Sequence, residues 1–166
     1  SGGVLAQDYE MYEQQTPHLL LEHELTCDSA GAGTWRGGLG THMAYQVGSK
    51  DTQIVTFGDG DFIPAFGLFG GGDSNLNLIE LTYPDGTKTK PNNKDLITGV
   101  PKGTVYYQVA QGGGGYGDPK ARPADRVADE VRNGVVSLNA ARDTYGVVVD
   151  PKTYGVDEAA TAELRA

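Results

Sequence analysis

The 166-residue sequence has little cysteine, little basic charge and no long apolar run. Its single cysteine, Cys27, cannot form an internal disulfide, and no Cys/His pair has the spacing of zinc ligands. Thirteen basic residues stand against 22 acidic ones, which gives a net charge of −9. A nucleic-acid partner would need a basic face. These shortages argue against a disulfide scaffold, a zinc site and nucleic-acid binding.

Signals for membrane insertion and export are also missing. No stretch of about 18 apolar residues could cross a bilayer, and the first residues do not form a basic-then-apolar leader. A lone free cysteine fits a reducing compartment. The sequence therefore predicts a cytoplasmic protein with no membrane partner.

Glycine, in contrast, is abundant. The chain has 25 glycines, where average usage of roughly 7% would give about 12. Glycine weakens helix interiors and suits tight turns and close approach of backbones. The composition therefore predicts short strands and many loops instead of a helical bundle.

Alternating apolar residues predict several short strands. Ser1–Gln15 is polar and is expected to be loop, whereas Leu19, Leu21 and Leu25 recur at period two, as in a half-buried strand. The same pattern recurs at residues 43–47 and 104–110, and residues 53–57 and 76–83 are further β-prone runs. Pro84 and Gly86 predict a hairpin turn over residues 83–87. We expect an antiparallel sandwich or open barrel with glycine-rich loops, forming a β-rich domain over residues 1–119.

The last third has helical signals instead. Val127 and Val131 lie four apart in residues 123–132, and Gly134 follows where a helix commonly ends. Ser137 and Asp157 are suitable N-caps for helices over residues 138–145 and 158–165. Residues 120–166 are therefore predicted to form a helical hairpin and tail, so that the fold class is α+β but mainly β.

Residues 28–40 form the first glycine-rich motif, with five glycines in 13 residues. A phosphate-binding loop would need a terminal Lys-Ser/Thr pair, or the Gly-x-Gly-x-x-Gly spacing that Arg36 breaks here. We therefore favour a structural loop in which Trp35 and Arg36 contact a neighbouring segment.

Two further motifs combine glycine with aromatic residues. Gly112, Gly113, Gly114 and Gly115 follow a predicted strand and precede Tyr116 and Asp118. Four consecutive glycines carry a high entropic cost of folding, so something is expected to approach their backbone: a bound anion, a second glycine-rich segment or a partner subunit. Packing against protein is favoured. In residues 64–72, Phe66, Leu68 and Phe69 are expected in a core or an interface.

The sequence assigns no catalytic residue and no metal ligand. It contains neither a Gly-x-Ser-x-Gly motif nor a Cys/His dyad for covalent catalysis. His23 lies between Glu22 and Glu24, whose side chains would point to the opposite face of a strand. His18, His23 and His42 are therefore expected to be structural.

Taken in order, four motifs resemble the C-terminal segment of the hydantoinase B/oxoprolinase family, which is related to acetone and acetophenone carboxylase subunits. They are residues 28–40, 66–71, 112–119 and 129–148. The resemblance implies a multi-subunit, ATP-dependent hydrolase or carboxylase in which this segment is not catalytic by itself. It implies that the segment binds no cofactor, and that ATP and a divalent metal are held elsewhere in the complex.

The implied partners are the remainder of a hydantoinase B-type subunit and a hydantoinase A-type ATP-binding subunit, in a hetero-oligomer. The leading hypothesis is a segment that completes an amidohydrolase opening hydantoin-like or 5-oxoproline-like rings. Two alternatives remain, a ketone carboxylase of the acetone or acetophenone type and a purely structural assembly module. The candidates for a substrate channel or an interface are Trp35, Arg36, Gly112, Gly113, Gly114, Gly115, Tyr116 and Asp118.

Overall fold

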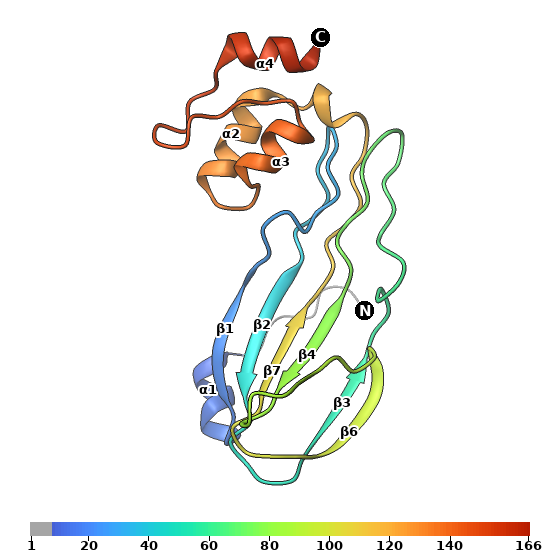
Figure 1. The fold of residues 1–166 in the computed structure, drawn as a ribbon, viewed down its shortest axis with the longest axis vertical. Helices are drawn as coiled ribbons and strands as arrows, with labels where there is room; N and C mark the ends of the chain where they lie inside the picture. The colour runs from blue at the N-terminus through green and yellow to red at the C-terminus, as the bar shows by residue number, and fades with distance from the viewer. Residues whose placement is uncertain (1–7) are drawn as a thin grey trace. The chain divides into compact units, whose positions relative to one another are not determined.

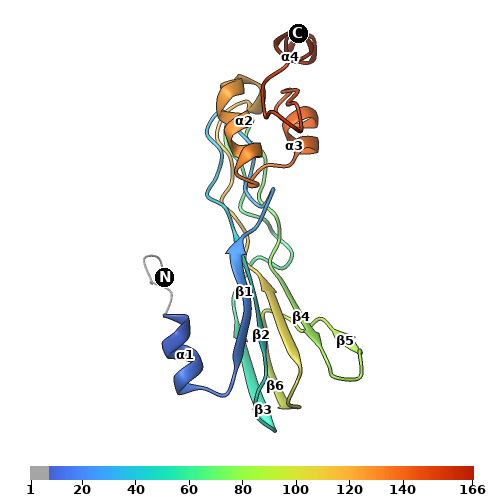
Figure 2. The ribbon, with the colours of Figure 1, turned by 90° about the vertical axis from the view of Figure 1, so that its left-hand side faces the viewer.

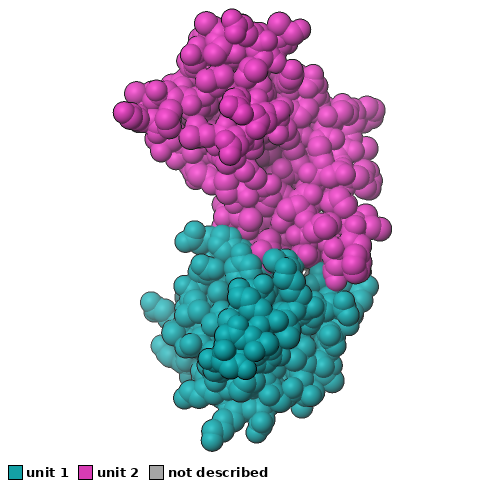
Figure 3. Space-filling model, in the orientation of Figure 1, with its two compact units in different colours: residues 1–24, 42–59, 78–108 teal, residues 25–41, 60–77, 109–166 magenta. Residues whose placement is uncertain are grey.

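A computed structural model describes residues 8–166 of the chain. The chain divides into two compact units (Figure 3). Unit 1 comprises residues 1–24, 42–59 and 78–108, and unit 2 comprises residues 25–41, 60–77 and 109–166. A domain boundary between residues 119 and 120 stays a prediction.

Unit 1 is built on two open sheets (Figure 1). The five-stranded sheet has the order β1-β2-β7-β4-β5, and the two-stranded sheet pairs β3 with β6. The strands are β1 (Leu19–Leu25), β2 (Thr41–Gln46), β3 (Thr52–Phe57), β4 (Leu78–Thr82), β5 (Lys88–Thr89), β6 (Lys94–Val100) and β7 (Val105–Val109). The β3–β6 and β4–β5 pairs are antiparallel, and β2, β7 and β4 alternate in direction in Figure 1. The predicted mainly β fold with antiparallel strands is confirmed, in the form of open sheets.

A short helix precedes the first strand. Helix α1 (Tyr9–Gln15) begins at Asp8, whose carboxylate accepts a hydrogen bond from the Met11 amide at 2.9 Å. Helix α1 lies beside β1 (Figure 2), and the Glu13 carboxylate accepts a hydrogen bond from the Leu20 amide at 2.8 Å. The predicted loop is therefore wrong for residues 9–15, while residues 1–7 lie outside the described residues.

The core of unit 1 contains Ala44, Val47, Ile79, Leu81 and Val100. The leucines of β1 are not part of it. Leu19, Leu21 and Leu25 are exposed, so the strand is where the alternation predicted it, but residues 8–166 do not half-bury its apolar face. The alternation identifies the apolar face of a strand without identifying what covers that face.

The turn that follows β4 agrees with its sequence signature. The Tyr83 amide donates to the Thr87 carbonyl at 2.8 Å, and the Gly86 amide donates to the Tyr83 carbonyl at 2.9 Å. Gly86 has φ of 85°, a conformation that glycine adopts without strain. The predicted hairpin turn is confirmed, and it joins β4 to β5.

Unit 2 carries the helices of the C-terminal part. They are the 3-10 helix η1 (Pro119–Ala121) and the α-helices α2 (Ala124–Arg132), α3 (Leu138–Asp143) and α4 (Glu158–Arg165). Ser137 and Asp157 accept hydrogen bonds from the amides of Ala140 and Ala160, which confirms both predicted N-caps. The hydrophobic core around the helices consists of Val127, Ala128, Val131, Val136, Ala141, Tyr145, Val147 and Val149.

Helices α2 and α3 form the predicted helical hairpin. Gly134, just after α2, has φ of 72°, as expected where a helix is terminated by glycine. Within residues 8–166, no helix combines the length and the apolar character needed to cross a membrane.

Candidate functional site

Three glycine-rich segments of unit 2, residues 31–40, 66–72 and 112–117, pack backbone against backbone; we call them the glycine bundle. A Cβ atom placed on Gly37 would lie 2.0 Å from the carbonyl oxygen of Gly113. A Cβ atom on Gly115 would lie 1.9 Å from the carbonyl oxygen of Ala32. Such positions require glycine, because neighbouring main chain occupies the space of a side chain.

Hydrogen bonds between main chains hold the glycine bundle together. The Gly31 amide donates to the Gly113 carbonyl at 2.8 Å. The Gly72 amide donates to the Ala32 carbonyl at 2.7 Å, and the Gly115 amide donates to the Gly72 carbonyl at 2.9 Å. Of the three neighbours considered for the run of four glycines, the structure shows other glycine-rich segments of the same chain.

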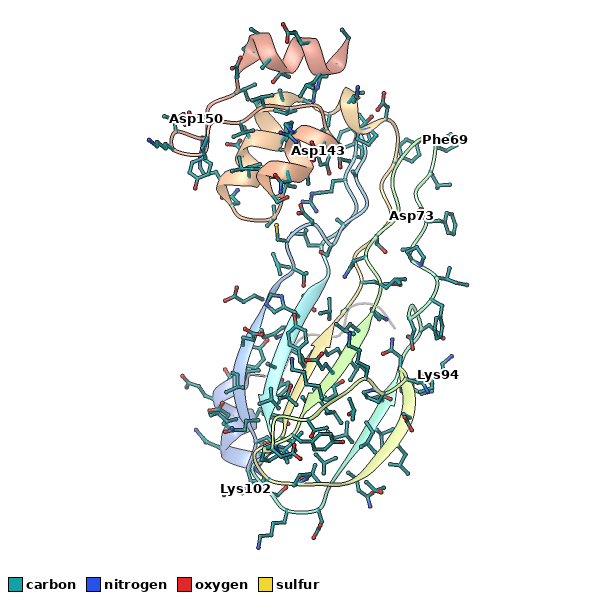
Figure 4. All side chains as sticks on the ribbon, in the orientation of Figure 1. Phe69, Asp73, Lys94, Lys102, Asp143 and Asp150 are labelled. Atoms are coloured by element: carbon teal, nitrogen blue, oxygen red, sulfur yellow. The ribbon has the colours of Figure 1, made fainter. Side chains whose placement is uncertain are left out.

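Since glycine fills its interior, the bundle presents its large apolar side chains outward. We define the apolar bundle surface as Trp35, Phe66, Leu68, Phe69 and Tyr116. Isolated bridges join Tyr116 to Trp35 and to Leu68, and the rings of Phe69 and Tyr116 lie 5.1 Å apart edge to face. Trp35 is 72% exposed and Phe69 is 77% exposed, and Figure 4 shows Phe69 projecting from its loop.

This surface corrects one part of the sequence analysis. Phe66, Leu68 and Phe69 were expected in a core or an interface, and the structure places them in no core of the described chain, because all three are exposed. Clustered aromatic side chains of this kind are typical of surfaces that contact another protein. The interface therefore stays as the prediction for them.

A partly buried charge cluster connects the glycine bundle to α2. Arg36 Nε and Arg122 Nη2 donate to the same Glu130 carboxylate oxygen, at 2.9 Å and 2.8 Å. Arg36 Nη1 also donates to the Gly37 carbonyl, and Arg122 Nη1 donates to the Thr34 carbonyl. These partners satisfy much of the donor capacity of both guanidinium groups, so Arg36 holds the bundle against the helix.

A cavity of about 530 Å³ lies beside this cluster within unit 2. Asp28, Asp73 and Asp143 are among its lining residues (Figure 4 labels the last two) and give it an acidic character. Tyr145 also lines it, and burial, followed by the Glu130 carboxylate, raises the pKa of the Tyr145 phenol. The phenol therefore stays protonated at neutral pH and can donate a hydrogen bond.

The structure places the predicted site residues in different surroundings. Trp35 and Tyr116 are brought together on the apolar bundle surface, whereas residues 112–115 lie in the packed bundle. Arg36 lies in the charge cluster, and Asp118 caps the short helix that follows it. Their assignment to a substrate channel or an interface stays a prediction.

Sequence reasoning missed Glu130 and Arg122. A signal for Glu130 was present, because a residue three positions after Val127 lies on the same face of the helix. A glutamate on an apolar face needs a cationic partner. The pairing with Arg36 was not predictable, since Arg36 is 94 residues away along the chain.

The histidines of unit 1 have protein partners. His18 Nδ1 accepts a hydrogen bond from the Gly48 amide at 3.3 Å, and His23 Nδ1 contacts the Tyr9 hydroxyl. In the part of the chain that the structure describes, no group of three or more His, Cys, Asp or Glu residues could hold a metal ion.

Comparison with protein families identifies the chain. Residues 1–119 match the profile of the hydantoinase B/oxoprolinase family. The chain belongs to this family. The resemblance predicted from the four ordered motifs is thus confirmed, and the glycine bundle contains most of three of them.

Individual proteins of known activity resemble nearly the whole chain. The caprolactamase beta subunit of Pseudomonas jessenii is 37% identical over 169 residues, which cover 99% of this chain and 29% of that protein. The acetone carboxylase alpha subunit of Xanthobacter autotrophicus is 31% identical, over 96% of this chain and 25% of that protein. The chain therefore spans less than a third of the curated relatives it matches.

Solved structures share the fold. The crystal structure of the ATP-dependent caprolactamase from Pseudomonas jessenii superposes with a TM-score of 0.82 and 38% identity, covering 97% of this chain and 28% of that one. A nucleotide-free acetone carboxylase structure superposes with a TM-score of 0.78 and 28% identity, covering 96% and 26%.

Proposed function

We propose that this chain is the C-terminal segment of a hydantoinase B-type subunit and completes an ATP-dependent enzyme that opens cyclic amides. The observation that carries this proposal is the similarity to caprolactamase, at 37% identity over 99% of the chain. A lactam, a hydantoin and 5-oxoproline share an amide bond within a ring, so one class of hydrolysis covers all three.

The apolar bundle surface supports a completing role. Covering a large apolar side chain is worth about 1.5–3 kcal/mol, so the five residues of that surface favour burial against protein. The glycine bundle that carries them is close-packed and held by main-chain hydrogen bonds, which gives the surface a fixed shape. A fixed apolar surface suits permanent assembly with the remainder of the subunit.

ATP and a divalent metal are proposed to bind in other parts of a hetero-oligomer that includes a hydantoinase A-type subunit. The caprolactamase and acetone carboxylase structures are both of ATP-dependent enzymes. The role proposed for this chain is to complete and hold the assembly, with Trp35 and Tyr116 at its contact surface.

One alternative has an observation of its own. The similarity to the acetone carboxylase alpha subunit covers 96% of the chain, which supports an ATP-dependent ketone carboxylase. The third hypothesis, a purely structural assembly module, makes the same use of the apolar bundle surface without a contribution to turnover.

The test is reconstitution with the companion polypeptides of the assembly, with and without this chain. We expect caprolactam, hydantoin or 5-oxoproline to be hydrolysed with consumption of ATP only when the chain is present. Incorporation of radiolabelled bicarbonate into a ketone would favour the carboxylase instead. Full turnover of a cyclic amide without the chain would contradict the completing role.

A variant of the contact surface tests the assembly role itself. Trp35→Ala should weaken association of the chain with its companions by about tenfold to a hundredfold, as expected for an aromatic anchor at an interface. Leu164→Ala is the matched control, because Leu164 is an exposed apolar residue on α4 that is not part of the apolar bundle surface. Equal association of both variants would argue against the bundle surface as the contact.

A further inference from the structure

Unit 1 has a second apolar face, on the ribbon formed by β3 and β6. Val55 and Leu96 are cross-strand partners and are 72% and 58% exposed. Phe57 lies two residues after Val55, on the same face, and is 94% exposed. We call Val55, Phe57 and Leu96 the ribbon face.

The opposite face of the same ribbon is partly buried. Thr56, which lies between Val55 and Phe57, is buried and its hydroxyl donates to the Asn92 carbonyl at 2.8 Å. Val100, at the end of β6, is almost fully buried. The inner side of the ribbon thus already has its partner within unit 1, and the ribbon face is a separate surface.

An isolated pair of strands has little stability of its own, and a ribbon with one apolar side uncovered lacks half of the packing that a sheet usually has. A phenylalanine that is almost completely exposed at the end of an ordered pair of strands is unfavourable in water. The ribbon face therefore has the character of an inner surface of a larger protein.

The charge at its border indicates what kind of partner fits. Lys94 is the cross-strand partner of Phe57, and its ammonium group is ion-paired with Asp59 at 2.5 Å (Figure 4 labels Lys94). With that charge paired, the ribbon face selects its partner by apolar contact and not by charge. The related caprolactamase subunit extends far beyond this segment, since only 29% of it is matched.

We infer that the ribbon face is a docking surface for an apolar face of the remaining portion of the hydantoinase B-type subunit, independent of the apolar bundle surface. This inference rests on the proposed function for the identity of the partner. It adds that unit 1 has a contact of its own and that Phe57 is its central anchor.

The first test is hydroxyl-radical labelling of the assembly, with the chain in its native context. Phe57 and Leu96 should be labelled at least about tenfold more slowly in the assembly than in the denatured chain, because docking removes them from water. Labelling of Phe57 in the assembly at the rate of the denatured chain would overturn the inference.

The second test replaces Phe57 by a charge. Phe57→Lys should weaken association with the companion polypeptide by about tenfold to a hundredfold, since it removes the anchor and would bury an unpaired ammonium group. Thr89→Lys is the matched control, an equally charged change at an exposed position of β5, which belongs to the other sheet. Circular dichroism of both variants verifies that the strands are retained.

The outcomes separate this inference from the proposed function. If the unaltered chain associates with its companion and both lysine variants associate equally well, the ribbon face is not the docking surface. The proposed function would still stand in that case. A chain that shows no association and restores no activity contradicts the proposed function first. Self-association of the chain, abolished by Phe57→Lys and with no companion needed, would assign the face to a second copy and overturn the inference.

Discussion

The glycine bundle and the helices of unit 2 have opposite constructions. Around the helices, valines, alanines and Tyr145 form a buried core, and the surface is largely polar. In the bundle, main chain fills the interior, and the aromatic side chains are outside. A core of side chains makes a segment stable by itself, whereas a core of backbone leaves apolar side chains free to contact another protein. The bundle is therefore the part of unit 2 that is suited to assembly.

The backbone core of the glycine bundle should tolerate an added methyl group poorly. The largest expected loss of stability follows from this. Gly37→Ala places a Cβ atom 2.0 Å from the Gly113 carbonyl oxygen. Because backbone cannot move aside as a side chain does, we expect the free energy of unfolding to fall by about 3 kcal/mol. Urea unfolding, followed by the fluorescence of Trp35, the single tryptophan, measures it.

Gly38→Ala is the control for that experiment. A Cβ atom at Gly38 would meet no atom of residues 8–166 within 4 Å, so its effect should stay within about 0.5 kcal/mol. Equal stability of the two neighbouring variants would remove the evidence for a core built of backbone.

The side-chain core is expected to respond to a deletion instead. Val127 is fully buried in the hydrophobic core, and Val127→Ala removes two methyl groups and leaves a small cavity. We expect a loss of about 2 kcal/mol, measured by thermal unfolding. Arg126→Ala, at an exposed position of the same helix, should have little effect, and a comparable loss there would show that the loss does not come from packing in the core.

Glu130 connects the helices of unit 2 to the glycine bundle. Glu130→Gln removes the charge that opposes both Arg36 and Arg122, while the amide still accepts one hydrogen bond. We expect a loss of about 1.5 kcal/mol, which is less than for a fully buried pair because these side chains keep some contact with water.

The adjacent residue supplies the comparison for Glu130. Asp129 forms an exposed ion pair with Arg132, so Asp129→Asn should change stability by less than about 0.5 kcal/mol. If Glu130→Gln is as mild as Asp129→Asn, the cluster does not hold the bundle against α2, and the two constructions are independent.

The helices of unit 2 were predictable from sequence because their signals are local. Ser137 and Asp157 cap helices that begin one residue later, and Gly134 follows the end of α2. Helix α1 was missed because it lacks an apolar repeat. Its contacts are with the sheet, as in the ring contact of Tyr12 with Tyr45.

The candidate site was only partly predictable. The sequence indicated that the four glycines at 112–115 are closely approached, but glycine has no side chain whose pattern would name the partner. The approach of residues 31–40 and 66–72 therefore required the structure. Likewise, alternation placed β1 correctly, while the exposure of its leucines depends on what surrounds the strand.

The smallest expected effect tests whether a loss of stability in α4 stays confined to that helix. The Asp157 carboxylate accepts a hydrogen bond from the Ala160 amide at 3.0 Å, and α4 is anchored by the buried Thr161, whose hydroxyl accepts from the Val148 amide. Asp157→Ala should cost about 1 kcal/mol, and Asp157→Asn should cost less because asparagine is also a good N-cap. Amide hydrogen exchange should quicken in α4 alone, while Trp35 fluorescence is unchanged. Faster exchange at Gly31 and Gly115 as well would mean that the helical part and the glycine bundle unfold as one unit, and that their different constructions do not give them separate stability.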